Sequence, residues 1–210
     1  MDVLTAAGTG VESTHRNAPI EGVTVMPSRL AIFLSLLVLL ALTRWGHFGT
    51  RLSLPDASLA VFLLGGLWLA RARAGGLGYF AALMLCAFAI DVYLAQTATE
   101  AGWCLTPAYW GLLPTYAVMW FTGRWLALSE RGSKPLPFAL AGLAATGAAF
   151  VISNVTFWAF SGQFGAMGAV EYAQAVARYF PPYLGSTALY LALGWAAQRW
   201  LFSRPNTAAA

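Results

Sequence analysis

Cys104 is the residue with the most distinctive chemistry, because it lies in a short polar segment, residues 97–107, between two long apolar runs. A thiolate is a soft ligand that favours transition metals, and a deprotonated cysteine is also a nucleophile. A loop cysteine kept inert by burial is the alternative interpretation. The residues alone leave both open.

The second cysteine, Cys86, is poorly placed for a disulfide with Cys104. It lies in the middle of an apolar run, and a helical run would hold it roughly 16 Å below the end that leads to Cys104. The two Cα atoms of a disulfide lie within about 7 Å of each other. We therefore interpret Cys86 as a small buried apolar residue.

Asp91 is the one carboxylate inside a predicted membrane span. An ionisable group at such a position is costly, and it is a candidate functional residue by default. The structural alternative is that Asp91 pairs with a tyrosine, with Arg44 or with Arg51. Asp91 is expected below the loop that contains Cys104, so binding and structural roles can coincide.

Three loops on one side of the predicted bundle add aromatic and polar groups to these two residues. His47, in the first loop, is either a ligand-binding or metal-binding imidazole or a plain interfacial histidine. Flat apolar surfaces with a few polar groups are typical of a site for a large amphipathic ligand. The candidate ligand-binding residues are Asp91, Tyr109, His47, Arg178, Trp103 and Tyr179.

Several classes of function are excluded by what the sequence lacks. It contains no Walker loop, no H-E-x-x-H motif and no usable Ser-His-Asp set, so ATP-driven work by this chain alone is not expected. Its twelve Lys and Arg residues are scattered singly rather than gathered in a stripe, so we predict no nucleic-acid partner.

The composition predicts a membrane protein. Of 210 residues, 59% are hydrophobic and 10% are charged, whereas soluble domains contain roughly 25% charged residues. Apolar runs long enough to cross a bilayer must be helical, because lipid offers the backbone no hydrogen-bond partners. The six predicted transmembrane helices are 30–46, 57–72, 77–97, 107–128, 136–158 and 180–202.

The basic residues predict the orientation of this all-α bundle. Nine of them fall on the side of the N-terminus, and three, Arg44, Arg51 and Arg178, fall on the other side. Because cytoplasmic loops are enriched in Lys and Arg, we expect both termini in the cytoplasm. In a bacterium this is a multi-pass inner-membrane protein whose His47 and Cys104 loops face the periplasm.

The chain is expected to have three regions. Residues 1–27 have the composition of a disordered tail, residues 28–203 form the six-helix transmembrane domain, and residues 204–210 form a short C-terminal tail.

The predicted frame and a few short motifs resemble a known family. Six helices with both ends inside resemble the substrate-binding S-components of energy-coupling-factor (ECF) vitamin transporters, and within them the BtuM family of cobalamin transporters. The resemblance rests on Asp91, Trp103-Cys104 and Tyr109, with weaker support from residues 52–56, 152–154 and 178–179.

This resemblance implies uptake of cobalamin (vitamin B12), bound from the periplasm in its base-off form, with Cys104 as axial ligand of the cobalt. It also implies thiol-dependent removal of cyanide from cyanocobalamin. Cys104 is then the candidate catalytic residue of a chain that is primarily a transporter. Asp91, Tyr109, His47 and Arg178 would line the site, and no cofactor other than cobalamin is predicted.

One feature departs from the S-component pattern. S-components typically dock on the shared energising module through small-xxx-small surfaces of the first helix, and Ala31 and Ala41 form no such pair here. This favours the solitary members of the family, which work without the module. Two alternatives stay open: a membrane thiol oxidoreductase that passes electrons to a quinone, and an S-component for a different vitamin.

Overall fold

The computed structural model describes residues 28–45, 54–97, 105–129 and 131–202. Within these ranges the chain forms seven α-helices, three short 3-10 helices and no strand, which confirms the predicted all-α class for the described part. The α-helices are α1 (Arg29–Trp45), α2 (Ser58–Leu69), α3 (Leu77–Thr97), α4 (Leu112–Leu128), α5 (Pro135–Phe160), α6 (Ala169–Ala177) and α7 (Phe180–Phe202). The 3-10 helices are η1 (Arg73–Gly76), η3 (Pro107–Gly111) and η4 (Arg131–Ser133).

Each predicted segment contains one α-helix of 12 or more residues, and the segments 77–97 and 180–202 agree with α3 and α7 residue for residue. The predicted segment 107–128 is not one continuous α-helix, because it begins with η3 and only then continues as α4. The nine-residue helix α6 was not predicted. The predicted tails, 1–27 and 204–210, lie outside the described residues.

Prolines and polar caps mark several helix starts. The Ser28 hydroxyl accepts a hydrogen bond from the Ala31 amide at 3.1 Å and so caps α1. Pro135 begins α5, where a missing amide hydrogen costs no helical hydrogen bond. The start of α2 is held from outside, because the Ala57 amide donates to the Thr43 hydroxyl of α1 at 3.3 Å.

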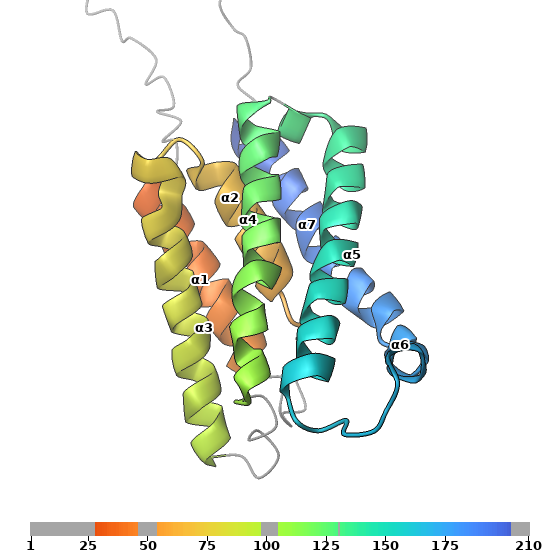
Figure 1. Cartoon of the computed structure of the whole chain (residues 1–210). Helices are drawn as coiled ribbons and strands as arrows, with labels where there is room; N and C mark the ends of the chain where they lie inside the picture. The colour runs from red at the N-terminus through yellow and green to blue at the C-terminus, as the bar shows by residue number, and fades with distance from the viewer. Residues whose placement is uncertain (1–27, 46–53, 98–104, 130, 203–210) are drawn as a thin grey trace, which may run out of the picture.

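The helices form an upright bundle with two distinct ends (Figure 1). Near one end, called the η4 end, lie the first residues of α1, the last of α7 and the turns around η1 and η4. At the other, the η3 end, lie the ends of α1 and α3, η3 and the connection from α5 to α6. The amphipathic helix α6 lies beside α5 at this end and is seen end-on in Figure 1.

Within the described ranges, α3 and α5 are long and apolar enough to cross a membrane. Helix α2 is apolar but has 12 residues, a length of about 18 Å against a hydrocarbon core of about 30 Å. All of its residues except Trp68 are buried, and it packs against α1, α3, α4 and α7. Helix α2 is therefore the interior element around which α1, α3, α4 and α7 are arranged.

The closest packing is between α2 and α4. A Cβ atom on Gly66 of α2 would collide with the main-chain carbonyl of Trp120, and one on Gly123 of α4 would collide with that of Leu63. Trp120 itself is fully buried. Glycine at both crossing points lets the two backbones come together as small residues do between membrane helices.

Replacing Gly66 by alanine is expected to destabilise the bundle by about 1–3 kcal/mol, because the new methyl group can only be accommodated by moving the α4 backbone. Thermal unfolding in detergent micelles measures the effect. Gly147→Ala is the matched control, since Gly147 is also helical and nothing lies within 4 Å of its Cβ position. Equal melting temperatures for the two variants would contradict the packing argument.

Candidate functional site

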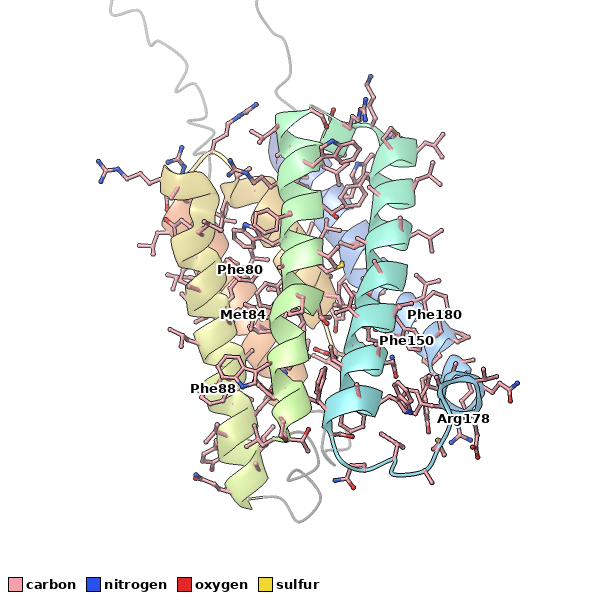
Figure 2. All side chains as sticks on the ribbon, viewed as in Figure 1. Phe80, Met84, Phe88, Phe150, Arg178 and Phe180 are labelled. Carbon is pink, nitrogen blue, oxygen red and sulfur yellow. The ribbon has the colours of Figure 1, made fainter. Side chains whose placement is uncertain are left out.

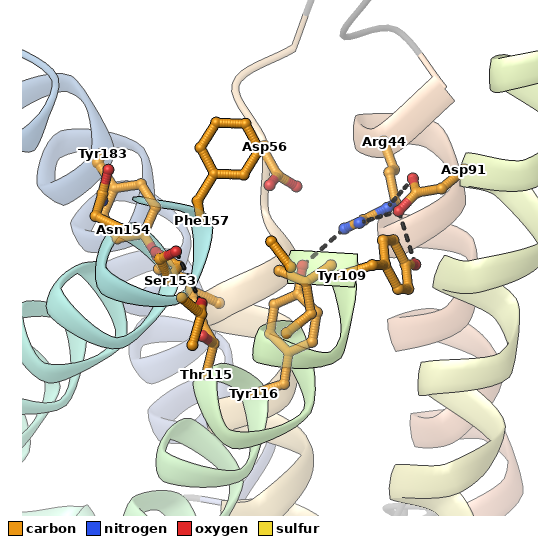
Figure 3. A pocket seen from close by; sticks show the side chains of 14 residues that line it. Arg44, Asp56, Asp91, Tyr109, Thr115, Tyr116, Ser153, Asn154, Phe157 and Tyr183 are labelled. Carbon is orange, nitrogen blue, oxygen red and sulfur yellow. Dashed lines mark hydrogen bonds and ion pairs between the residues drawn. The ribbon is translucent and has the colours of Figure 1, made fainter. Parts of the chain in front are cut away.

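A cavity of about 340 Å³ opens near the η3 end of the bundle, between the start of α2, the end of α3 and the far part of α5 (Figure 3). One wall comes from α1, α2, α3, η3 and the start of α4, and the opposite wall comes from α5 and α7. Its polar and aromatic lining residues are Arg44, Asp56, Asp91, Tyr109, Thr115, Tyr116, Ser153, Asn154, Thr156, Phe157 and Tyr183.

The first wall is built on an ion pair between α1 and α3. Arg44 donates from Nε to Oδ1 of Asp91 at 2.7 Å and from Nη2 to Oδ2 at 2.5 Å. The side chains are 12% and 11% exposed. Two parallel hydrogen bonds between guanidinium and carboxylate are the strongest common form of such a pair. The predicted alternative in which Asp91 pairs with Arg44 or a tyrosine is thus confirmed.

Further hydrogen bonds extend the pair to three more elements. Arg44 Nη1 donates to the Ser58 hydroxyl of α2 at 2.9 Å and to the Tyr116 hydroxyl of α4 at 2.8 Å. The Tyr109 hydroxyl of η3 donates to Asp91 Oδ2 at 2.9 Å. Both Asp91 oxygens are therefore used within the protein, and the network joins α1, α2, α3, η3 and α4.

Aromatic contacts fix the tyrosines of this network. The Tyr116 ring stacks on Phe62 of α2 with centroids 4.3 Å apart, and the Tyr109 ring meets Phe88 of α3 edge-on at 5.5 Å. Figure 2 shows Phe88 on the lower half of α3, on the same helix as Asp91. Each hydroxyl is thereby directed toward the ion pair by packing of its ring.

Asp56 is the second carboxylate of the cavity, and it differs from Asp91. Its Oδ1 accepts from the Ser58 amide at 2.9 Å and from the Ser58 hydroxyl at 2.6 Å, which caps the start of α2. Among the described residues, all its hydrogen bonds involve Oδ1. With Arg44 and Asp91 neutralising each other, Asp56 leaves the described lining with one net negative charge and a carboxylate oxygen available to a ligand.

The opposite wall is polar but uncharged. Asn154 of α5 donates from Nδ2 to the Phe150 carbonyl at 2.8 Å and accepts at Oδ1 from the Tyr172 hydroxyl of α6 at 3.3 Å. Burial raises the pKa of Tyr172, so its hydroxyl keeps the proton that it donates. The rings of Phe157 and Tyr183 complete this wall as apolar surface.

The structure brings together two of the predicted ligand-binding residues, Asp91 and Tyr109, and leaves two others apart from the cavity. Arg178 donates to the Tyr179 hydroxyl at 2.9 Å, and its guanidinium lies over the Tyr179 ring. Both side chains are exposed at the junction of α6 and α7, and neither lines the cavity. Figure 2 shows Arg178 beside α6. His47, Trp103 and Cys104 lie outside the described residues.

Cys86 is a free cysteine, half-buried against the core in the middle of α3. It lies eleven positions before the end of α3 at Thr97, a rise of roughly 16 Å. This agrees with the interpretation of Cys86 as a packing residue. In the described ranges no three His, Cys, Asp or Glu side chains come together as a metal site would require.

Sequence reasoning missed the roles of Asp56, Tyr116 and Asn154. Asp56 carried a usable signal, since an aspartate two residues before an apolar helix is a typical cap. Tyr116 carried none, because an aromatic residue inside an apolar run gives no indication of the direction of its hydroxyl. Asn154 was noted only as part of a weak motif.

Comparison with models of known protein families and with curated proteins finds no match for this chain. Its function therefore has to be inferred from the site and the loops that adjoin it.

Proposed function

We propose that this chain is an inner-membrane protein that binds cobalamin on the periplasmic side and carries it across the bilayer. In this proposal α1, α2, α3, α4, α5 and α7 are the six transmembrane helices, and both termini lie in the cytoplasm. It is the function that the site supports best. The orientation, the ligand and the cobalt ligand are supported by different observations.

The distribution of cations supports the orientation. The basic residues at or near the η4 end are Arg29, Arg71, Arg73, Arg124, Arg131, Lys134 and Arg199. At the η3 end the described basic residues are Arg44 and Arg178, and Arg44 is buried against Asp91. This distribution supports a cytoplasmic η4 end, because cytoplasmic loops are enriched in Lys and Arg.

The observation that carries the ligand proposal is the position of the cavity relative to the loops. Arg44 and Asp56 flank the segment that contains His47, and Asp91 and Tyr109 flank the segment that contains Cys104. Four lining residues thus bracket both loops in which the sequence predicts ligand contacts. A ligand seated in the cavity would extend toward the two segments.

The lining suits part of a corrinoid. Cobalamin has a flat macrocycle edged by amide side chains, and the cavity offers aromatic faces, a carboxylate acceptor at Asp56 and an amide at Asn154. A volume of 340 Å³ accepts only one edge of so large a molecule. The remaining surface of the ligand would be covered by the loops, as is usual where a rigid scaffold presents its binding segments.

Cys104 would then supply the cobalt ligand. Its thiolate would donate an electron pair to the lower axial position of the cobalt, which the base-off form leaves free. Cyanide bound on the opposite face would be labilised and would leave with its own electron pair as cyanide ion. Cobalt is part of the transported ligand in this scheme, and transport proceeds without the energising module.

Two cysteine variants test this proposal. Full-length protein incubated with cyanocobalamin is expected to retain the corrinoid with an altered visible spectrum. Cys104→Ala is expected to abolish the spectral change, and the matched control Cys86→Ala is expected to keep it. A bacterial strain that lacks its own inner-membrane cobalamin importer should grow on cobalamin with the wild-type protein or Cys86→Ala, but not with Cys104→Ala.

If the wild-type protein retains no corrinoid, the proposed function is wrong. If Cys104→Ala and Cys86→Ala give the same bound spectrum as the wild type, cobalamin binding stands but ligation by the thiolate is refuted.

A further inference from the structure

A second hollow lies on the outside of the bundle, between α4 and α5, and it is separate from the cavity at the η3 end. This groove has a volume of about 690 Å³. Its α5 side is formed largely by four alanines, and its α4 side by Val118, Thr122 and Trp125. The alanines are Ala141, Ala144, Ala145 and Ala148.

The spacing of the alanines explains the shape of the groove. Positions 141, 144, 145 and 148 follow the i, i+3, i+4, i+7 pattern that places residues on one face of a helix. Ala145 is buried at the floor, whereas Ala144 is exposed. Large exposed side chains, Leu136 and Leu140, also line it near its η4 end. The result is an open, mostly apolar groove along α5.

The length of the groove matches one leaflet of a bilayer. On α5 it extends from Leu136 to Ala148, a rise of roughly 18 Å. One leaflet contributes about half of a hydrocarbon core of about 30 Å. The groove therefore has the length that an acyl chain needs to pass from the interface to the middle of the membrane.

The described charged residues at the mouth of the groove, at the η4 end, are cations. Arg131 of η4 lines it, with its guanidinium 5.0 Å from the centre of the Trp125 ring. Arg131 is exposed, and so is Lys134, the residue before α5. The first turn of α5 has no side-chain cap and contains no acidic residue, so the positive end of its helix dipole points to the same place.

From the apolar lining of this groove and its charged mouth together we propose that the groove binds an anionic phospholipid. The phosphate would lie beside Arg131, and one acyl chain would lie along the alanines. The positive charge of Arg131 favours an anionic headgroup, and the alanine face leaves room for a thin, flexible acyl chain. The inference depends on the protein lying in a membrane and is independent of cobalamin binding.

Native mass spectrometry of the full-length protein, with equal amounts of dioleoylphosphatidylglycerol and dioleoylphosphatidylcholine, tests this site. The wild-type protein is expected to retain the anionic lipid in preference to the zwitterionic one. Arg131→Gln should lower retention of the anionic lipid about fivefold, the effect of one basic residue at an anionic membrane surface. Ala144→Leu, which fills the groove, should remove both lipids.

Two matched variants control for charge and size. Arg73→Gln removes an exposed cation near the same end, and Ala81→Leu enlarges an exposed alanine on α3; both residues lie outside the groove. Both variants should retain the lipid as the wild type does. All four substituted positions are exposed, so the variants should keep the melting temperature of the wild type.

The proposal is overturned if both lipids are retained equally, or if Arg131→Gln behaves like Arg73→Gln. It is also overturned if Ala144→Leu keeps the lipid. A wild-type protein that is a dimer, with Ala144→Leu a monomer, would overturn it as well, because the groove would then bind a helix of a second copy.

Discussion

Replacing Arg44 by methionine is expected to destabilise the protein by about 3–5 kcal/mol, because it leaves the Asp91 carboxylate buried without its partner charge. Methionine has a similar length and no charge, so the loss reports the ion pair rather than a cavity. Chemical unfolding in detergent micelles, followed by tryptophan fluorescence, measures the difference in the free energy of unfolding.

The double variant Arg44→Met with Asp91→Leu separates a lost ion pair from a lost contact. A buried pair replaced on both sides by apolar groups is often neutral for stability, so the double variant should recover most of the stability that Arg44→Met loses. Losses that simply add in the double variant would show that the two residues are not coupled. Tyr109, which donates only to Asp91 among these groups, should tolerate phenylalanine better in the double variant than in the wild type.

Replacing Asp56 by asparagine is expected to weaken cobalamin binding about tenfold or more, because a hydrogen bond to a charged group contributes about 1.5–3 kcal/mol. Stability should change little, since asparagine caps a helix about as well as aspartate. Titration with cyanocobalamin, followed by its visible absorbance, measures the affinity. This prediction depends on the proposed function.

Asp91→Asn is the matched comparison for Asp56, because it makes the same chemical change on the other carboxylate of the cavity. It should lower the free energy of unfolding, since it removes the negative charge to which Arg44 and Tyr109 donate hydrogen bonds. If Asp56→Asn binds the ligand as the wild type does, Asp56 makes no contact with it. If Asp91→Asn leaves stability unchanged, the network has no structural role.

The positions of the helices could be predicted from the sequence far better than the contacts within the site. Long apolar runs bounded by polar residues identify helices reliably, so α3 and α7 were predicted residue for residue. Helix α6 is short, but residues 169, 172, 173 and 176 lie on one face and line an apolar pocket over α5. This helical spacing is present in the sequence, but nine residues are too few for a membrane span.

The partners of Asp91 could be limited to a few residues but not chosen from the sequence. Hydrophobic helices have no polar face that shows how each one is rotated, so Arg44 and Tyr109 could not be selected over other candidates near the same surface. The role of Tyr116 depends on the packing of α2 against α4, which the glycines at positions 66 and 123 permit. Such long-range packing is not encoded in any local pattern.

The shortness of α2 has a consequence for how the membrane potential is distributed. In the bilayer that we propose, the start of α2 at Ser58 adjoins the cavity, and the helix ends at Leu69 after 12 residues. Helix α2 is about 18 Å long, whereas the hydrocarbon core of a bilayer is about 30 Å thick. A charged group that enters the cavity has already crossed part of the electric field, and the rest falls along α2 and the helices that enclose it.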